Sequence, residues 1–258
     1  MLPSLFIAHG APLLAIEDNE YTQFIRGLGD TLSRSKAVVL FSAHWEAPVQ
    51  KVGDVLRYET IYDFGGFPDA LYQIQYPASG DHALVEEITS LFEASNMSYE
   101  RDTKRGLDHG AWVVLRLLFP KADVPVISMS VNSRLSPKEQ YNIGKSLRSL
   151  RENDVLIVAS GGTVHNLRML LWDAEGATDS AVSFDDWLQH RLEAWDLPSL
   201  YEYRQLAPHA DYAVPVYGNE HFIPLFYAMG AADDARRATL LHRSYRYGSL
   251  SHSIWQFG

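Results

Sequence analysis

Three histidines of the sequence each follow a short apolar segment. His9 follows residues 2–8 and His44 follows residues 37–43. His165 follows residues 154–160 after the short turn GGTV. Imidazole binds transition metals and has a pKa near neutrality, so these side chains could hold a metal ion or transfer a proton. A single histidine in such a place is most often a core or loop residue bonded to a backbone carbonyl. Three of them at separate segment ends favour one shared site.

The apolar segments themselves predict buried strands. Four of them are short, continuous and rich in Val, Ile and Leu: residues 2–8, 37–43, 124–131 and 154–160. This composition is typical of strands covered on both faces of a mostly parallel sheet. Helical patterns are expected at four places between them: residues 20–34, 80–95, 110–119 and 136–151. Strands that alternate with helices predict an α/β fold with a central sheet flanked by helices.

After residue 165 the sequence pattern changes from alternating strands and helices to mainly helices, followed by a C-terminal segment of alternating apolar and polar residues. Helices are expected at residues 180–195 and 221–232, and residues 238–258 alternate apolar and polar side chains around Gly248. This alternation predicts antiparallel strands added at an edge of the sheet. Because no repeat, low-complexity tract or flexible linker is found in the sequence, we expect a single domain over residues 1–258.

The fold class predicts where the three histidines meet. In open parallel α/β sheets, ligands bind in the crevice beyond the carboxyl ends of the strands, where residues distant in sequence converge. Gly10 follows His9, and Gly161 and Gly162 precede His165, which leaves the backbone unobstructed near a bound group. We therefore expect a site at this end of the sheet.

Two further histidines could belong to this site, but each also has a simpler structural explanation. Glu220-His221 begins a helical run, where the helix dipole alone would favour the carboxylate. Asp108-His109 begins another helical run, where Asp108 could be only the N-cap. The remaining histidines are expected to be surface or structural residues: His82, His190, His209, His242 and His252.

Composition narrows the class of partner. A formal net charge of -10 and a pI near 5.4 argue against a nucleic-acid-binding surface, so we expect small-molecule partners. The chain has no cysteine, so any metal must be held by His, Asp or Glu. The N-terminal residues do not resemble a signal peptide, and no apolar run approaches the roughly 18 residues of a membrane span. We expect a cytoplasmic protein that does not act at a membrane.

Seven short motifs occur in order along the chain. They are HGAP (9–12), SAHWE (42–46), DFGGFP (63–68), GLDHGAW (106–112), ISMS (127–130), ASGGTVHNL (159–167) and EHFIPL (220–225). Together they resemble the class III extradiol ring-cleaving dioxygenases, specifically the subfamily similar to DOPA 4,5-dioxygenase. The resemblance implies a non-haem Fe(II) enzyme that inserts both atoms of O2 into a catechol and opens its ring.

The resemblance also implies roles for single residues. Three correspond to metal ligands: His9, His44 and His221. His165 corresponds to an acid/base near the metal or to a fourth metal contact, and His109 to a pocket histidine that stabilises or protonates a reaction intermediate. Glu220 stays open as the third ligand, because the broader family uses two histidines and a carboxylate. Fe(II) is expected for activity, although such proteins often carry Zn(II) when purified.

Two other functions are compatible with the same residues. A zinc-dependent hydrolase could use the three ligand histidines to hold a water that attacks an amide or ester, with Glu46 as the nearest candidate base. A non-catalytic binding protein would hold the metal without turnover. We expect a monomer, since neither a heptad pattern nor an apolar stripe indicates a partner subunit.

Overall fold

The computed structural model describes residues 1–174 and 176–258, and within them one sheet has the strand order β4-β3-β5-β2-β6-β1-β8-β7. The strands are β1 (Ser4–Ala8), β2 (Ala37–Glu46), β3 (Gln50–Gly53), β4 (Tyr99–Asp102), β5 (Val126–Val131), β6 (Val155–Gly161), β7 (Ala238–Arg246) and β8 (Leu250–Phe257). The four strands expected from their apolar composition form the centre, β5-β2-β6-β1, and every pairing among them is parallel. The predicted α/β fold with a mostly parallel sheet is confirmed.

Antiparallel strands flank this parallel centre. β8 pairs with β1 and β7 pairs with β8, both antiparallel, which confirms the predicted C-terminal edge. On the other side, β3 pairs antiparallel with β5 through Val52 and Met129, and parallel with β4. The sequence does not predict β3 and β4, because QKVG and YERD are too short and too polar to be distinguished from loops by their pattern.

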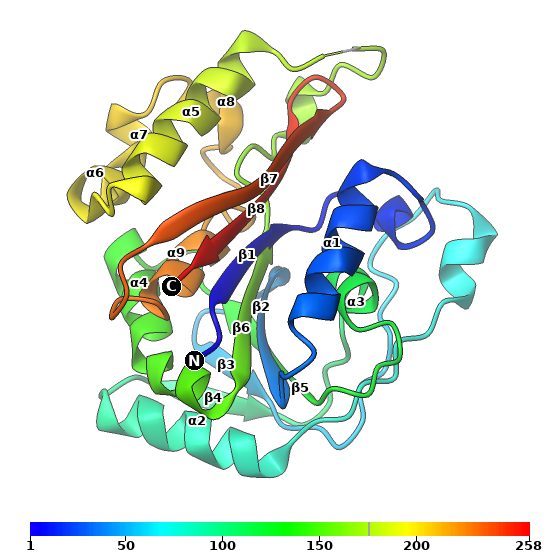
Figure 1. Cartoon of the computed structure of the whole chain (residues 1–258), viewed down its shortest axis with the longest axis vertical. Helices are drawn as coiled ribbons and strands as arrows, with labels where there is room; N and C mark the ends of the chain where they lie inside the picture. Colours follow the sequence, from blue (N-terminus) through cyan, green and yellow to red (C-terminus); the bar gives the residue numbers. More distant parts are fainter. Residues whose placement is uncertain (175) are drawn as a thin grey trace.

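Helices cover both faces of the sheet (Figure 1). They are α1 (Glu20–Thr31), α2 (His82–Ala94), α3 (His109–Leu118), α4 (Pro137–Ser146), α5 (Asp179–Glu193), α6 (Leu197–Tyr201), α7 (Tyr203–Leu206), α8 (Ala210–Ala213) and α9 (Pro224–Gly230). Side chains of β1 alternate between two cores, since Leu5 packs in the core that contains Trp112 of α3, and Phe6 in the core that contains Phe226 of α9. Burial on both faces is why the central strands are continuously apolar.

One predicted helix is shorter in the structure. Residues 136–151 form α4, which begins at a capping box of Ser136 and Glu139, and then a separate 3₁₀ turn at Arg148–Asn153. α4 packs closely against α9 at Gly144, which has no side chain. A Cβ on Gly144 would lie only 1.9 Å from the carbonyl oxygen of Tyr227. This contact fixes α9, and with it the turn that precedes α9 in the sequence.

Two site histidines lie in different local structures from those we predicted. β2 does not end at Ala43 but continues to Glu46, so His44 is inside the strand, where a register shift against β5 occurs between Phe41 and Glu46. His221 lies in the turn before α9, because the helix begins only at Pro224. The backbone N–H groups of Phe222 and Ile223 donate to the carbonyl oxygen of Asn219 and hold that turn.

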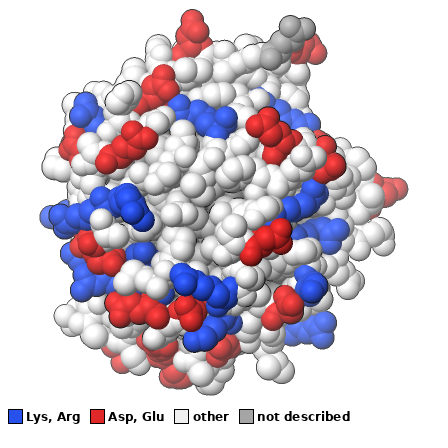
Figure 2. All heavy atoms as spheres, in the orientation of Figure 1, with Lys and Arg blue, Asp and Glu red and all other residues white. Residues whose placement is uncertain are grey.

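The surface carries both signs of charge. Figure 2 shows basic and acidic side chains next to one another around the rim of the visible face, with uncharged residues between them. In the described part of the chain, no helix combines the length and the apolar character that crossing a membrane requires.

Candidate active site

Five histidines from separate segments of the chain meet at the carboxyl end of the parallel strands. His9 follows β1, His44 lies in β2, His109 is the first residue of α3, His165 follows β6, and His221 precedes α9. Nε2 of His44 lies 3.0 Å from Nε2 of His9 and 3.3 Å from Nε2 of His221. The His165 ring stacks on the His221 ring at a centroid distance of 3.6 Å, and the His109 ring lies 4.0 Å from the His44 ring.

A hydroxyl group determines which nitrogen of His9 carries its proton. Nδ1 of His9 lies 2.9 Å from Oγ of Ser160, and the same hydroxyl donates to the carbonyl oxygen of Gly110. Because a hydroxyl has one proton to donate, Ser160 must accept from His9, which places the proton on Nδ1. Nε2 of His9 therefore presents a lone pair to the cluster.

Glu220 contacts His221 at Nδ1, whereas Nε2 of the same ring faces His44. Its Oε1 lies 3.1 Å from Nδ1 of His221. A carboxylate only accepts hydrogen bonds, so this contact again leaves the lone pair on Nε2 of the ring. Ligand atoms of His9, His44 and His221 lie within 4.8 Å of one another, and so do those of a second group, His44, Asp63 and His109; Glu220 belongs to neither group.

Asp63 is a site residue that the sequence did not reveal as one. It lies in the segment between β3 and the 3₁₀ turn at Asp69–Gln73, and its Oδ1 accepts from both the backbone N–H and Nδ1 of His109, each at 2.9 Å. Its Oδ2 lies 3.5 Å from Nδ1 of His44. The motif DFGGFP contains this carboxylate, but its histidine partners lie far away in the sequence, so no local pattern marks Asp63 as a site residue.

Asp108 caps α3, as the simpler alternative for Asp108-His109 predicted. Its Oδ1 accepts from the backbone N–H of Ala111 and from Oγ of Ser42, and its side chain is buried. The capping function does not exclude His109 from the site, because the first residue of the helix points its ring at His44 and His9.

The donor set fits a divalent transition metal. Imidazole nitrogens bonded to one metal at about 2.0–2.1 Å, with bond angles between 90° and the tetrahedral value, lie about 2.9–3.4 Å apart. The observed separations of 3.0 and 3.3 Å fall in that range. Three lone pairs directed at one another would repel, whereas a cation among them would turn the same arrangement into coordination.

Burial keeps these rings in the form that binds metal. Burial, and then the neighbouring imidazoles, lower the pKa of His9 and of His221 well below the usual value. Burial also lowers the pKa of His165, with a further contribution from His221. Asp63, in contrast, favours its charged form. Burial alone would raise its pKa, but the hydrogen bonds from His109 outweigh burial and lower the pKa to about 2.

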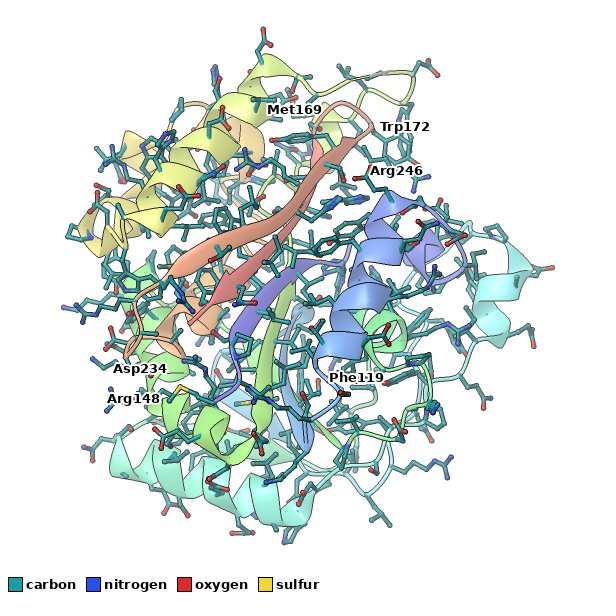
Figure 3. The ribbon with its side chains drawn as sticks, in the orientation of Figure 1. Phe119, Arg148, Met169, Trp172, Asp234 and Arg246 are labelled. Carbon is teal, nitrogen blue, oxygen red and sulfur yellow. The ribbon has the colours of Figure 1, made fainter. Side chains whose placement is uncertain are left out.

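A pocket of about 510 Å³ opens beside His165 and His221. Its wall includes Asn166, Leu167, Arg168, Val216, Tyr217 and Glu220. The segment that continues from Arg168 runs past the tip of the β7–β8 hairpin, where the Ser249 hydroxyl donates to the carbonyl oxygen of Met169 and the backbone N–H of Leu171 donates to that of Tyr247. Figure 3 labels Met169, Trp172 and Arg246 around this tip. The Trp172 ring lies 4.7 Å from the Tyr247 ring at that tip.

The other histidines lie outside this cluster. His82 is exposed and pairs with Asp54, and His190 and His209 are exposed. His242 lies 5.1 Å and His252 4.6 Å, measured between ring centroids, from the ring of Tyr21. His252 is buried, with 5% of its surface exposed.

Comparison with known proteins identifies the family of the chain. The family model described as the catalytic LigB subunit of aromatic ring-opening dioxygenase matches residues 3–258. The chain belongs to this LigB family. As a member it is an oxidoreductase of the ring-opening dioxygenases, which confirms the resemblance to class III extradiol enzymes of the DOPA 4,5-dioxygenase type.

Relatives of this LigB family member match nearly its whole length. The 4,5-DOPA dioxygenase extradiol of Beta vulgaris is 38% identical over 258 residues, covering 98% of this chain and 96% of the relative. The 4,5-DOPA dioxygenase extradiol of Escherichia coli K12 is 36% identical over 261 residues, covering 100% and 95%. A crystal structure of an uncharacterized protein from Escherichia coli K12 superposes with a TM-score of 0.84 at 31% identity and covers 100% of both chains.

Proposed function

We propose that this chain is an extradiol dioxygenase that inserts both atoms of O2 into a catechol and opens the ring at a non-haem Fe(II). The observation that carries the proposal is the convergence of the Nε2 atoms of His9, His44 and His221, each with an acceptor near its Nδ1. These three residues would hold the ion. We propose one catalytic domain over residues 1–258 that acts as a monomer.

The bound Fe(II) would supply a Lewis acid and one-electron chemistry for catechol and O2. The chain's part is to bind that ion from one side only. All three ligand candidates lie where the parallel strands and α9 meet, and the pocket beside His165 and His221 provides room for a planar substrate. Zn(II) fits the same three imidazoles, so zinc in a purified sample would not argue against an iron enzyme.

His165 is proposed as the base that takes the proton of a catechol hydroxyl. It lines the pocket, and its ring is held parallel to His221 while its backbone N–H donates to the carbonyl oxygen of Ala213. The neutral ring that burial favours can accept a proton and return it later in the reaction. Stacking on a proposed ligand brings His165 to the place where a substrate oxygen would bind.

His109 is proposed as a second pocket histidine that donates to, or accepts from, the reacting oxygens. Asp63 binds its Nδ1 and so leaves Nε2 of the same ring available. The Phe64 ring packs edge-on against His109 at 5.7 Å and restricts its orientation. Burial of His109 excludes most water from the group that would act on the substrate.

A DOPA-like substrate is supported by the relatives and by the pocket wall. The matched proteins of Beta vulgaris and Escherichia coli K12 are named 4,5-DOPA dioxygenases. Arg168 and Glu220 line the pocket with charges of opposite sign, an arrangement that suits a catechol carrying both an ammonium and a carboxylate group.

Reconstitution tests the proposal directly. The metal-free protein is loaded with Fe(II) without oxygen, mixed with L-DOPA or an unsubstituted catechol, and exposed to air. We expect uptake of one O2 for each ring opened and growth of a yellow ring-cleavage chromophore. Hydrolysis of an ester or amide with Zn(II), in the absence of both signals, would instead favour a zinc hydrolase. Metal binding with no turnover of any kind would favour a binding protein.

A further inference from the structure

Asp63 contacts two histidines of the site with one carboxylate. Its Oδ1 accepts from the backbone N–H and from Nδ1 of His109, and its Oδ2 lies 3.5 Å from Nδ1 of His44. The other Nδ1 partners each serve a single ring, since Ser160 binds His9 and Glu220 binds His221. Asp63 therefore lies between a proposed metal ligand and a proposed pocket histidine.

We propose that Asp63 is a positioning residue that sets the tautomers of His44 and His109 together, an inference that rests on the proposed metal site. A carboxylate accepts hydrogen bonds and donates none, so the hydrogen bond with His109 places the proton of that ring on Nδ1. The carboxylate charge 3.5 Å from Nδ1 of His44 favours the same tautomer of the His44 ring. His44 then offers its Nε2 lone pair to the ion, and His109 keeps a free Nε2 for the substrate side. Such partners of metal-bound histidines orient the ring and raise its basicity.

The backbone around Asp63 is held firmly enough for this purpose. The carbonyl oxygen of Ile61 accepts from the indole N–H of Trp112 at 3.0 Å, and the backbone N–H of Ile61 donates to Leu107 at 2.8 Å. The Tyr62 hydroxyl donates to the carbonyl oxygen of Ile74 at 2.7 Å. The segment is thus fixed to α3, the helix that begins with His109, so the carboxylate is in place before a metal or a substrate binds.

A simpler role for Asp63 would be to fill space and tether this segment. The tethering role and the positioning role predict different effects of Asp63→Asn. Asparagine has nearly the same volume and keeps one oxygen, so a tether would survive the change. It also carries an NH2 group, which must face an N–H of one of the two rings and so oppose the tautomer needed there.

The test compares four metal-free proteins: wild type, Asp63→Asn, Asp63→Ala and the control Asp69→Asn. Asp69 is an exposed carboxylate in the 3₁₀ turn that follows the same segment. Zn(II) affinity is measured by calorimetry with a competing chelator at fixed pH. We expect Asp63→Asn and Asp63→Ala each to bind Zn(II) roughly 10–100-fold more weakly, and Asp69→Asn to bind like wild type. With saturating Fe(II), kcat for L-DOPA should fall in both Asp63 variants while KM changes less.

Several results would overturn the inference. One is an Asp63→Asn protein that binds Zn(II) as tightly as wild type while Asp63→Ala does not, because only the tether explains that order. Another is an Asp63→Asn protein that no longer unfolds cooperatively without metal, since the carboxylate would then serve the fold. The proposed function fails separately: if Fe(II)-loaded wild type opens no catechol but Asp63→Asn still loses Zn(II) affinity, the positioning role stands without the dioxygenase.

Discussion

Neutral imidazoles with an acceptor behind each ring are the chemical basis of this site. Burial lowers the pKa of His9, His44 and His221, so a proton competes poorly with a metal at Nε2. Two of the acceptors are carboxylates and one is a hydroxyl, which places negative charge close to a site that would bind a dication.

Removal of one proposed ligand should release the metal. In His9→Ala and in His44→Ala, two imidazoles are left, and we expect neither protein to retain stoichiometric iron after gel filtration, as measured by elemental analysis. The exposed His190 provides the control, since His190→Ala removes an imidazole far from the cluster. Full iron content in both ligand variants would show that the assignment of ligands is wrong.

Removal of the His165 imidazole should lower the rate of catechol cleavage but leave most of the metal bound. General acid–base groups contribute roughly 10²–10⁴-fold to rate, so we expect His165→Ala to lower kcat for catechol cleavage by that factor and to retain most of the iron. Steady-state oxygen uptake and metal analysis on the same sample measure both quantities. Loss of the metal together with activity would instead identify His165 as a ligand.

At the scale of elements, three parallel strands and one helix contact bring the site together. The pairing of β6 with both β1 and β2 places Gly161 beside Ala8 and Ser160 beside Ser42, so the segments that follow β1 and β6 and the end of β2 lie together. The position of His221 depends instead on α9, which packs on α4 through Gly144 and Gly230. A Cβ on either glycine would lie 1.9 Å from a backbone carbonyl oxygen of the other helix. His221 precedes α9, so this packing sets its position.

A methyl group at Gly144 should therefore separate α4 from α9. We expect Gly144→Ala to lower the free energy of unfolding by about 1–3 kcal/mol, since the backbone must shift to relieve the overlap, and to weaken metal binding by moving His221. Urea denaturation and metal titration measure the two effects. The control is Gly27→Ala in α1, where a Cβ would meet no described atom within 4 Å; helix propensity predicts a gain there of about 0.5–1 kcal/mol. Equal stability of the two variants would contradict this account of the contact.

For the molecule as a whole, stability should depend on pH through buried histidines that are neutral in the folded chain. His252 in β8 is one that lies outside the ligand set: burial, with Arg246 nearby, lowers its pKa to about 4. Its ring stacks on Tyr21 of α1, and its Nε2 has no hydrogen-bond partner among the described residues. The His252 ring thus packs the β7–β8 hairpin against α1, and its burial favours the neutral form.

Acidification should weaken the fold through His252. In the unfolded chain this histidine binds a proton near pH 6.5, but in the folded chain only near pH 4, so the stabilisation present above pH 6.5 is lost as the pH falls toward 4. The loss amounts to about 3 kcal/mol for this group. We expect His252→Gln to be less stable than wild type at pH 7 and to lose less stability between pH 7 and pH 4, measured by urea denaturation of metal-free protein. The exposed His190→Gln should follow the wild-type profile, and parallel profiles for His252→Gln and wild type would refute the prediction.

Much of this arrangement follows from sequence alone, because it depends on local pattern. Continuous Val, Ile and Leu runs predicted the four parallel strands, since burial on both faces leaves no polar alternation. Alternation around Gly248 predicted the hairpin of β7 and β8. The positions of His9 and His165 after strands indicate a shared site, and the ordered motifs indicate the family.

Other features required the tertiary structure, because they depend on atoms that are far apart in the chain. Ser160 and His9 are 151 residues apart, and Asp63 and His109 are 46 apart, so neither pairing leaves a local signal. The register shift that keeps His44 inside β2 depends on the partner strand β5. Sequence therefore determined which imidazoles could meet, whereas three-dimensional packing decided which nitrogen of each ring faces inward and which acceptor stands behind it.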